Sequence, residues 1–187
     1  QLEHIRDISK IAKKNKLKLH MDGARFANAC AFLKCTPSEM TWKSGIDILS
    51  LGATKNGALS CELVVVFNKN LHAYVDRRQK RAGHLLSKQK FIAAQIIKWI
   101  ENDKWIKAAS KANNFAKKIG NILKNNKKIN VIYPIESNMI FLELSLESEL
   151  NLKKSNVEFY NWPSNNNTLR FVTSWNFKNK EINILKN

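Results

Sequence analysis

Residues 48–57 have the sequence ILSLGATKNG, in which a short apolar run ends at Gly52 and leads into Lys55. The apolar segment Asp47–Leu51 is bounded by turn residues, and this pattern favours a buried β-strand. Glycines at 52 and 57 let the backbone approach a ligand closely, because no Cβ stands in the way. The sequence therefore predicts a strand that delivers a lysine into a tight glycine-bounded loop.

A second short strand is predicted at Leu17–Met21, and it ends on Asp22. An acid and a lysine that follow neighbouring strands can contact one small ring from two sides. In a pyridoxal phosphate enzyme the lysine amine holds the cofactor as an imine, and the carboxylate faces the pyridinium nitrogen. On local sequence alone, however, Lys55 is explained more simply as a surface lysine, and Asp22 equally well as a helix N-cap.

The first part of the chain alternates between helical and strand patterns. Such alternation predicts an α/β architecture with helices over a largely parallel sheet. We expect the third strand to be fully buried and, because its return loop is short, antiparallel to the second. Helices are expected at 2–14 and 25–34, and a third strand at 63–67. Residues 69–128 have helical character throughout, with helices expected at 91–101 and 105–123.

The last third of the chain predicts a smaller α+β domain. Its strand patterns occupy 129–133, 139–144, 157–160 and 169–174, and its helical patterns occupy 146–154 and 178–185. We therefore expect a large domain over residues 1–115 and a small domain over 116–187. Three tryptophans, Trp99, Trp105 and Trp162, are expected in the core.

The composition excludes several classes of protein. The formal net charge of +17 suggests a nucleic-acid-binding module, but the lysines are scattered along the chain and only six basic residues are arginine. We therefore expect a solvated lysine surface and no nucleic-acid site. No apolar run is long enough to cross a bilayer. Three cysteines without a CxxC spacing predict reduced thiols, a cytoplasmic location and no metal site.

Taken together in order, five segments of this chain resemble the threonine aldolases. These enzymes belong to the β-eliminating lyase group of fold type I pyridoxal phosphate enzymes. The resemblance extends over about residues 1–180 and includes the acid and lysine segments. The five segments are LHMDGAR (19–25), GATKNG (52–57), RRQKRAGHLLSK (77–88), PIESNMIF (134–141) and LRFVTS (169–174).

The resemblance implies a role for each of five residues. Lys55 is the catalytic lysine, and Lys55, Asp22 and Thr54 bind pyridoxal 5'-phosphate, with Thr54 at the phosphate. Arg25 and Arg170 bind the α-carboxylate of an amino-acid substrate. Simpler alternatives are loop capping for Thr54 and ordinary salt bridges for the two arginines. No metal is implied.

The implied reaction is the cleavage of threonine to glycine and acetaldehyde by a homo-oligomer, a dimer or a tetramer. Another fold type I enzyme, such as an aminotransferase or another β-eliminating lyase, would share the same acid and lysine. A basic nucleic-acid-binding module is the alternative from a different class. The chain opens at Gln1 without methionine and has no segment for the phosphate loop or for ring stacking. We therefore expect a C-terminal fragment that is inactive alone.

Overall fold

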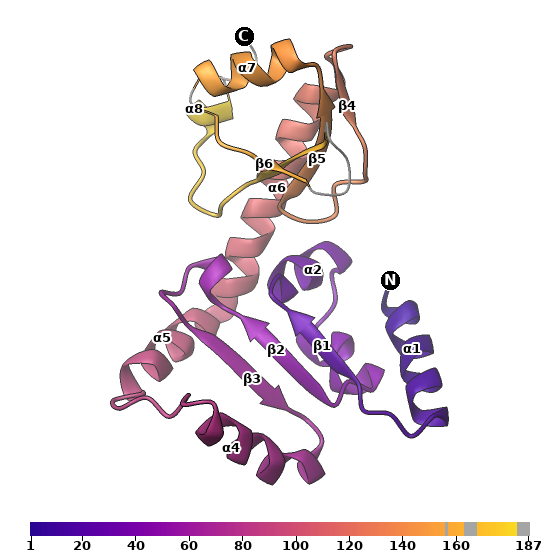
Figure 1. Ribbon diagram of the computed structural model, residues 1–187, viewed down its shortest axis with the longest axis vertical. Helices are drawn as coiled ribbons and strands as arrows, with labels where there is room; N and C mark the ends of the chain where they lie inside the picture. The colour runs from indigo at the N-terminus through magenta and orange to yellow at the C-terminus, as the bar shows by residue number, and fades with distance from the viewer. Residues whose placement is uncertain (156, 163–167, 183–187) are drawn as a thin grey trace. The chain divides into compact units, whose positions relative to one another are not determined.

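The computed structural model describes residues 1–155, 157–162 and 168–182 (Figure 1). The chain divides into two compact units, Gln1–Lys107 and Ala108–Asn187. The division lies within helix α6 (Lys104–Lys124), slightly before the boundary at residue 115 that the sequence suggests.

The first unit is built on a sheet of three strands, β1 (His20–Gly23), β2 (Ile48–Gly52) and β3 (Glu62–Val66), in that order. Strands β1 and β2 are parallel, with Asp22 opposite Ser50, whereas β3 runs antiparallel to β2 (Figure 1). The antiparallel return is confirmed. The expectation of a largely parallel sheet is corrected to a mixed one, because the loop after β2 is too short for a parallel crossover.

Two of the strands differ from their expected form. Strand β1 begins at His20 rather than Leu17, since the backbone N–H of Leu19 donates to the carboxylate of Asp47 at 2.9 Å. Strand β3 was expected to be fully buried, and this is wrong. Val64 is 58% exposed, and among the described residues β3 is one of the two edge strands of the sheet.

Helices and short 3₁₀ turns connect these strands. The region of helical character expected over 69–128 is interrupted between 82 and 89, where Gly83 and Lys88 take positive φ values. A capping box at Thr36 and Glu39 starts one short helix. The helices are α1 (Leu2–Lys14), α2 (Phe26–Leu33), α3 (Pro37–Met40), α4 (His72–Arg81) and α5 (Lys90–Ile100), and the turns are η1 (Trp42–Ser44), η2 (Thr54–Asn56), η3 (Lys69–Leu71) and η4 (Glu101–Asp103).

Over its described residues, the second unit combines helices with a four-stranded sheet. Its sheet is antiparallel throughout the described residues, with strand order β4-β5-β7-β6. Of the predicted helix 178–185, residues 183–185 lie outside the described chain. The elements are β4 (Ile129–Val131), β5 (Met139–Leu144), α7 (Leu146–Lys154), β6 (Tyr160–Asn161), β7 (Thr168–Val172) and α8 (Asn179–Ile182).

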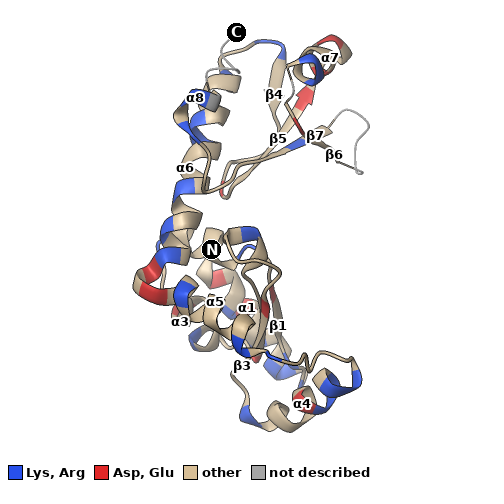
Figure 2. Cartoon of the chain, turned by 90° about the vertical axis from the view of Figure 1, so that its left-hand side faces the viewer, with Lys and Arg blue, Asp and Glu red and all other residues tan. Residues whose placement is uncertain are grey.

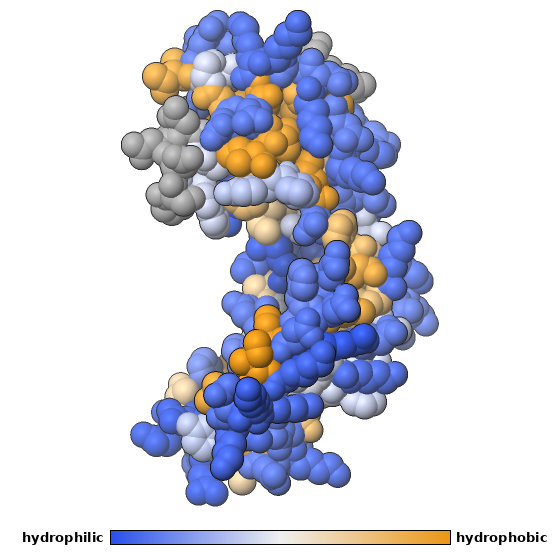
Figure 3. Space-filling model, turned by 90° about the vertical axis from the view of Figure 1, so that its right-hand side faces the viewer, coloured by the Kyte–Doolittle hydropathy of each residue, from blue (hydrophilic) through white to orange (hydrophobic). Residues whose placement is uncertain are grey.

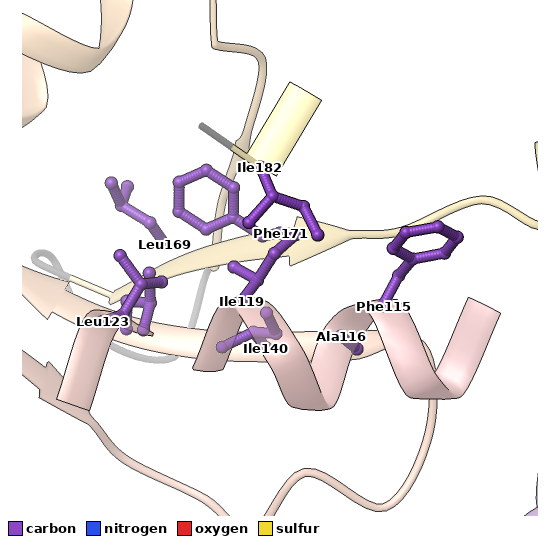
Figure 4. Packing of buried hydrophobic residues seen from close by; sticks show 9 residues of the cluster. Phe115, Ala116, Ile119, Leu123, Ile140, Leu169, Phe171 and Ile182 are labelled. Atoms are coloured by element: carbon purple, nitrogen blue, oxygen red, sulfur yellow. The ribbon is translucent and has the colours of Figure 1, made fainter. Parts of the chain in front are cut away.

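One face of this sheet packs against α6 to form the core of the second unit (Figure 4). Ile140 and Ala116 are fully buried, and burial of an isoleucine-sized side chain stabilises the fold by about 1.5–3 kcal/mol. Successive residues of a strand point to opposite faces, so the residues between these core positions lie on the other face. The core cluster comprises Phe115, Ala116, Ile119, Leu123, Ile140, Leu142, Leu169, Phe171 and Ile182.

The surface is rich in lysine in both units. Figure 2 shows Lys and Arg spread over many elements, and the face in Figure 3 is mostly hydrophilic with separate hydrophobic patches. All three cysteines are free thiols, Cys30 and Cys61 being buried and Cys35 half-buried. Burial raises the pKa of the Cys30 thiol well above its usual value. Among the described residues, no helix combines the length and hydropathy of a membrane span.

Candidate active site

The acid and the lysine singled out by the sequence follow two adjacent parallel strands. Asp22 lies near the end of β1, and Lys55 lies in η2, just after the end of β2. The carboxyl ends of parallel neighbours meet at one edge of a sheet, where α/β proteins bind ligands. Both side chains are exposed at this edge. The fold of the first unit thus places an acid at the end of one strand and an amine in the turn after its parallel neighbour.

Glycine brings these two loops together. A Cβ on Gly52 would lie 2.8 Å from Cα and 2.9 Å from the carbonyl oxygen of Ala24, in the turn that follows Asp22. A Cβ on Gly23 would lie 2.6 Å from the carbonyl oxygen of Ser50. Real side chains do not approach backbone so closely, so these two positions require glycine. The spacing between the acid loop and the lysine loop depends on them.

The carboxylate of Asp22 is oriented by the backbone of its own turn. Its Oδ1 accepts a hydrogen bond from the N–H of Ala24 at 3.0 Å. The N-cap position of α2 is occupied by Arg25, without a side-chain cap. Asp22 therefore closes a tight turn and does not cap the helix, which removes the simpler alternative that its sequence suggested.

The lysine loop is anchored by the residue next to Lys55. Asn56 is buried, its Nδ2 donates to the carbonyl oxygen of Trp105 at 2.8 Å, and its own carbonyl accepts from Trp99 Nε1 at 3.0 Å. The loop closes at Gly57, whose φ of 105° lies in the left-handed region. These bonds fix the backbone that carries the lysine.

Reasoning from sequence missed the role of Asn56. An Asn-Gly pair after Lys55 indicates a turn, but the two tryptophans that hold the asparagine lie 43 and 49 residues away in sequence. No local pattern marks such a partner. Both tryptophans, Trp99 and Trp105, are in the core as expected, whereas Trp162 is half-buried, so its expected place in the core is wrong.

Thr54 caps its own loop. Its hydroxyl donates to the carbonyl oxygen of Cys61 at 3.2 Å and accepts from the N–H of Cys61 at 3.0 Å. Its backbone N–H donates to the carboxylate of Glu62 at 3.3 Å. This is the loop-capping role that the sequence left open beside a phosphate contact.

The two candidate arginines belong to different units. Arg25 is half-buried and directly follows the Asp22 turn, and its carbonyl oxygen accepts from the N–H of Ala29 at 3.1 Å. Arg170 lies in β7, half-buried, with its Cζ 5.0 Å from the ring centroid of Tyr160 and 5.1 Å from that of Trp162.

A histidine and a serine link the two parallel strands beside the site. His20 Nε2 lies 2.9 Å from the hydroxyl oxygen of Ser50. This contact joins β1 to β2 through side chains. Among the described residues, no group of three His, Cys, Asp or Glu side chains is arranged to hold a metal ion.

The sequence matches the β-eliminating lyase family over residues 1–145. The chain belongs to this family. Members of the β-eliminating lyase family depend on pyridoxal phosphate, and the Asp22 and Lys55 placement at one sheet edge fits that cofactor.

Individual relatives agree with this assignment. The chain is 37% identical over 180 residues to the low specificity L-threonine aldolase of a Pseudomonas species, covering 96% of this chain and 52% of the relative. It is 38% identical over 173 residues to the enzyme of the same name from Pseudomonas aeruginosa, covering 92% of this chain and 50% of the relative. This β-eliminating lyase chain therefore spans about half the length of the curated relatives it matches.

Solved structures share the fold. The threonine aldolase of Leishmania major aligns with a TM-score of 0.87 at 23% identity, and the alignment covers 99% of this chain and 55% of that one. At this identity the likeness concerns the fold alone. It shows that this β-eliminating lyase chain shares the fold of about half of that structure.

Proposed function

We propose that the protein carrying this chain is a pyridoxal phosphate-dependent carbon–carbon lyase that cleaves L-threonine to glycine and acetaldehyde. The single observation that carries the proposal is the placement of Asp22 and Lys55 at the ends of two adjacent parallel strands of a β-eliminating lyase chain. The names of the two Pseudomonas relatives support threonine as the substrate.

Three residues would hold the cofactor. When bound, pyridoxal phosphate acts as an electron sink for the bond that is cleaved. The Lys55 amine would hold it covalently, and the Asp22 carboxylate would keep a proton on the ring nitrogen. Because the backbone already orients one Asp22 oxygen, that carboxylate needs little reorganisation to do so. Thr54 remains a candidate phosphate contact, for which its O–H would exchange the Cys61 carbonyl for a phosphate oxygen.

Two arginines would bind the substrate. A guanidinium forms two parallel hydrogen bonds with a carboxylate, which fixes both the position and the orientation of the anion. We assign this role towards the threonine α-carboxylate to Arg25 and Arg170. An anchored carboxylate restricts rotation of the substrate and so holds the reacting bond in a productive orientation.

The test is covalent trapping in the full-length protein that contains this chain. Pyridoxal phosphate and borohydride treatment should label Lys55, as peptide mass spectrometry would show. Lys55→Ala should abolish the label and the visible absorbance, Asp22→Asn should shift the absorbance, and the surface control Lys69→Ala should leave both unchanged. A label on another lysine would contradict the assignment.

Reaction class is tested separately. Acetaldehyde release from threonine should be detected with an aldehyde reductase coupled to NADH oxidation. Transfer of the amino group to a keto acid, with no acetaldehyde formed, would instead identify an aminotransferase. We expect residues 1–187 alone to be inactive, and the full-length protein to be a dimer or tetramer by light scattering.

A further inference from the structure

The sheet of the second unit has two chemically different faces. One face carries the aliphatic core that packs on α6. The other face carries a row of three paired residues on adjacent strands, since Arg170 in β7 lies opposite Phe141 in β5 and opposite Tyr160 in β6. An arginine therefore stands at the centre of an aromatic row, outside the core.

The aromatic rings on this face are in contact with one another. The centroids of Tyr133 and Phe141 are 5.5 Å apart, and those of Phe141 and Trp162 are 5.2 Å apart, both pairs edge to face. The guanidinium carbon of Arg170 lies 5.1 Å from the Trp162 centroid and 5.0 Å from the Tyr160 centroid. Both distances are within the range of cation–π attraction.

The hydrogen bonding of Arg170 is incomplete. Its Nε is buried and has no acceptor among the residues that the structure describes. A buried donor without an acceptor is costly, so the site favours an arriving acceptor. Tyr160 and Trp162 contact the guanidinium through their rings, and a guanidinium in such contact can still donate N–H groups to an anion. A carboxylate supplies two oxygens in the guanidinium plane.

We propose that Tyr160 and Trp162 are positioning residues that hold the Arg170 guanidinium in the orientation that binds the substrate α-carboxylate. This inference rests on the proposed function, which assigns the carboxylate to Arg170. The two rings act through Arg170 and do not touch the substrate. An arginine that is already ordered loses less side-chain entropy when its anion binds, so substrate binds more tightly.

Nuclear magnetic resonance tests directly whether Tyr160 and Trp162 hold the Arg170 guanidinium. Six arginines give six Nε–H signals in the arginine-labelled chain, and Arg170→Lys identifies the one of interest. We expect the Arg170 signal to be displaced by ring currents from Trp162 and Tyr160. Trp162→Leu should return it towards the signals of exposed arginines, and Trp162→Phe should retain most of the displacement.

Kinetics of the full-length protein test the consequence. Trp162→Leu and Tyr160→Leu should each raise KM for threonine about tenfold, in keeping with the loss of one cation–π contact. The value of kcat should stay within about threefold, because the lost interaction is a binding one. Trp162→Phe should restore KM. Tyr133→Leu is the matched control, since it removes an aromatic from the same face without touching Arg170.

The outcomes separate this inference from the proposed function. An unshifted Arg170 signal in the parent chain would show that the two rings do not position Arg170. A Trp162→Leu variant with a lowered melting temperature but an unchanged KM would show the same. If the full-length protein acquires no visible absorbance with pyridoxal phosphate, the proposed function fails. The resonance measurement still decides whether the rings order the arginine.

Discussion

Replacing Asn56 by alanine tests whether the lysine loop is held by the buried bonds described above. The substitution removes the Nδ2 donor that lies 2.8 Å from the carbonyl oxygen of Trp105. That carbonyl is shielded from water, so water does not replace the lost donor. The neighbouring Lys55 then lies on a loop with one of its anchors missing.

The magnitude follows from the burial of Asn56, which is 6% exposed. Loss of one partner of a buried hydrogen bond costs about 1–3 kcal/mol. For a chain of this size, about 2 kcal/mol corresponds to a melting temperature about 4–8 °C lower. Urea denaturation followed by tryptophan fluorescence measures the free energy of unfolding. In the full-length protein, borohydride trapping at Lys55 should fall in parallel.

Asn15→Ala is the matched control for this substitution. Asn15 also donates from Nδ2 to a backbone carbonyl, that of Ile11 at 2.9 Å, but the bond is exposed. Its loss should change the free energy of unfolding by no more than about 0.5 kcal/mol. Equal effects of the two substitutions would refute the argument that Asn56 anchors the lysine loop.

Three further substitutions give distinct signatures. Gly52→Ala should destabilise the chain by about 1–3 kcal/mol in urea, because its Cβ would press on backbone atoms of the acid loop. Asp47→Ala should lower the free energy of unfolding by about 1–3 kcal/mol, since the backbone N–H of Leu19 and the side-chain amide of Asn68 both lose their acceptor. Hydrogen bonds from Lys104 and Lys98 lower the pKa of Glu101 to about 2. The stabilisation of the folded chain by the Glu101 carboxylate is therefore present above its ordinary pKa and is lost as the pH falls towards 2. The difference in melting temperature between Glu101→Gln and the parent should therefore vanish over that pH range.

Much of the second unit could be predicted from local patterns. Strand β5 and helix α7 have the bounds that the sequence predicts, and α6 differs from its predicted range by one residue at each end. These elements have one buried face or a clear boundary residue, so periodicity alone defines them. In the first unit β1 begins at His20, three residues later than predicted, because the Leu19 N–H that a longer strand would use donates to the Asp47 carboxylate instead.

The sequence by itself determined that an acid and a lysine follow two short apolar strands, because residue order and periodicity are local properties. It also determined the family, through five ordered segments that include Asp22 and Lys55. Only the tertiary structure decided that β1 and β2 are parallel neighbours, that Asn56 is held by two distant tryptophans, and that Trp162 lies beside Arg170 rather than in the core. The physical reason is that contacts between residues far apart in the chain depend on which strands pair and on which face of the sheet each side chain lies. A local sequence pattern determines neither of these.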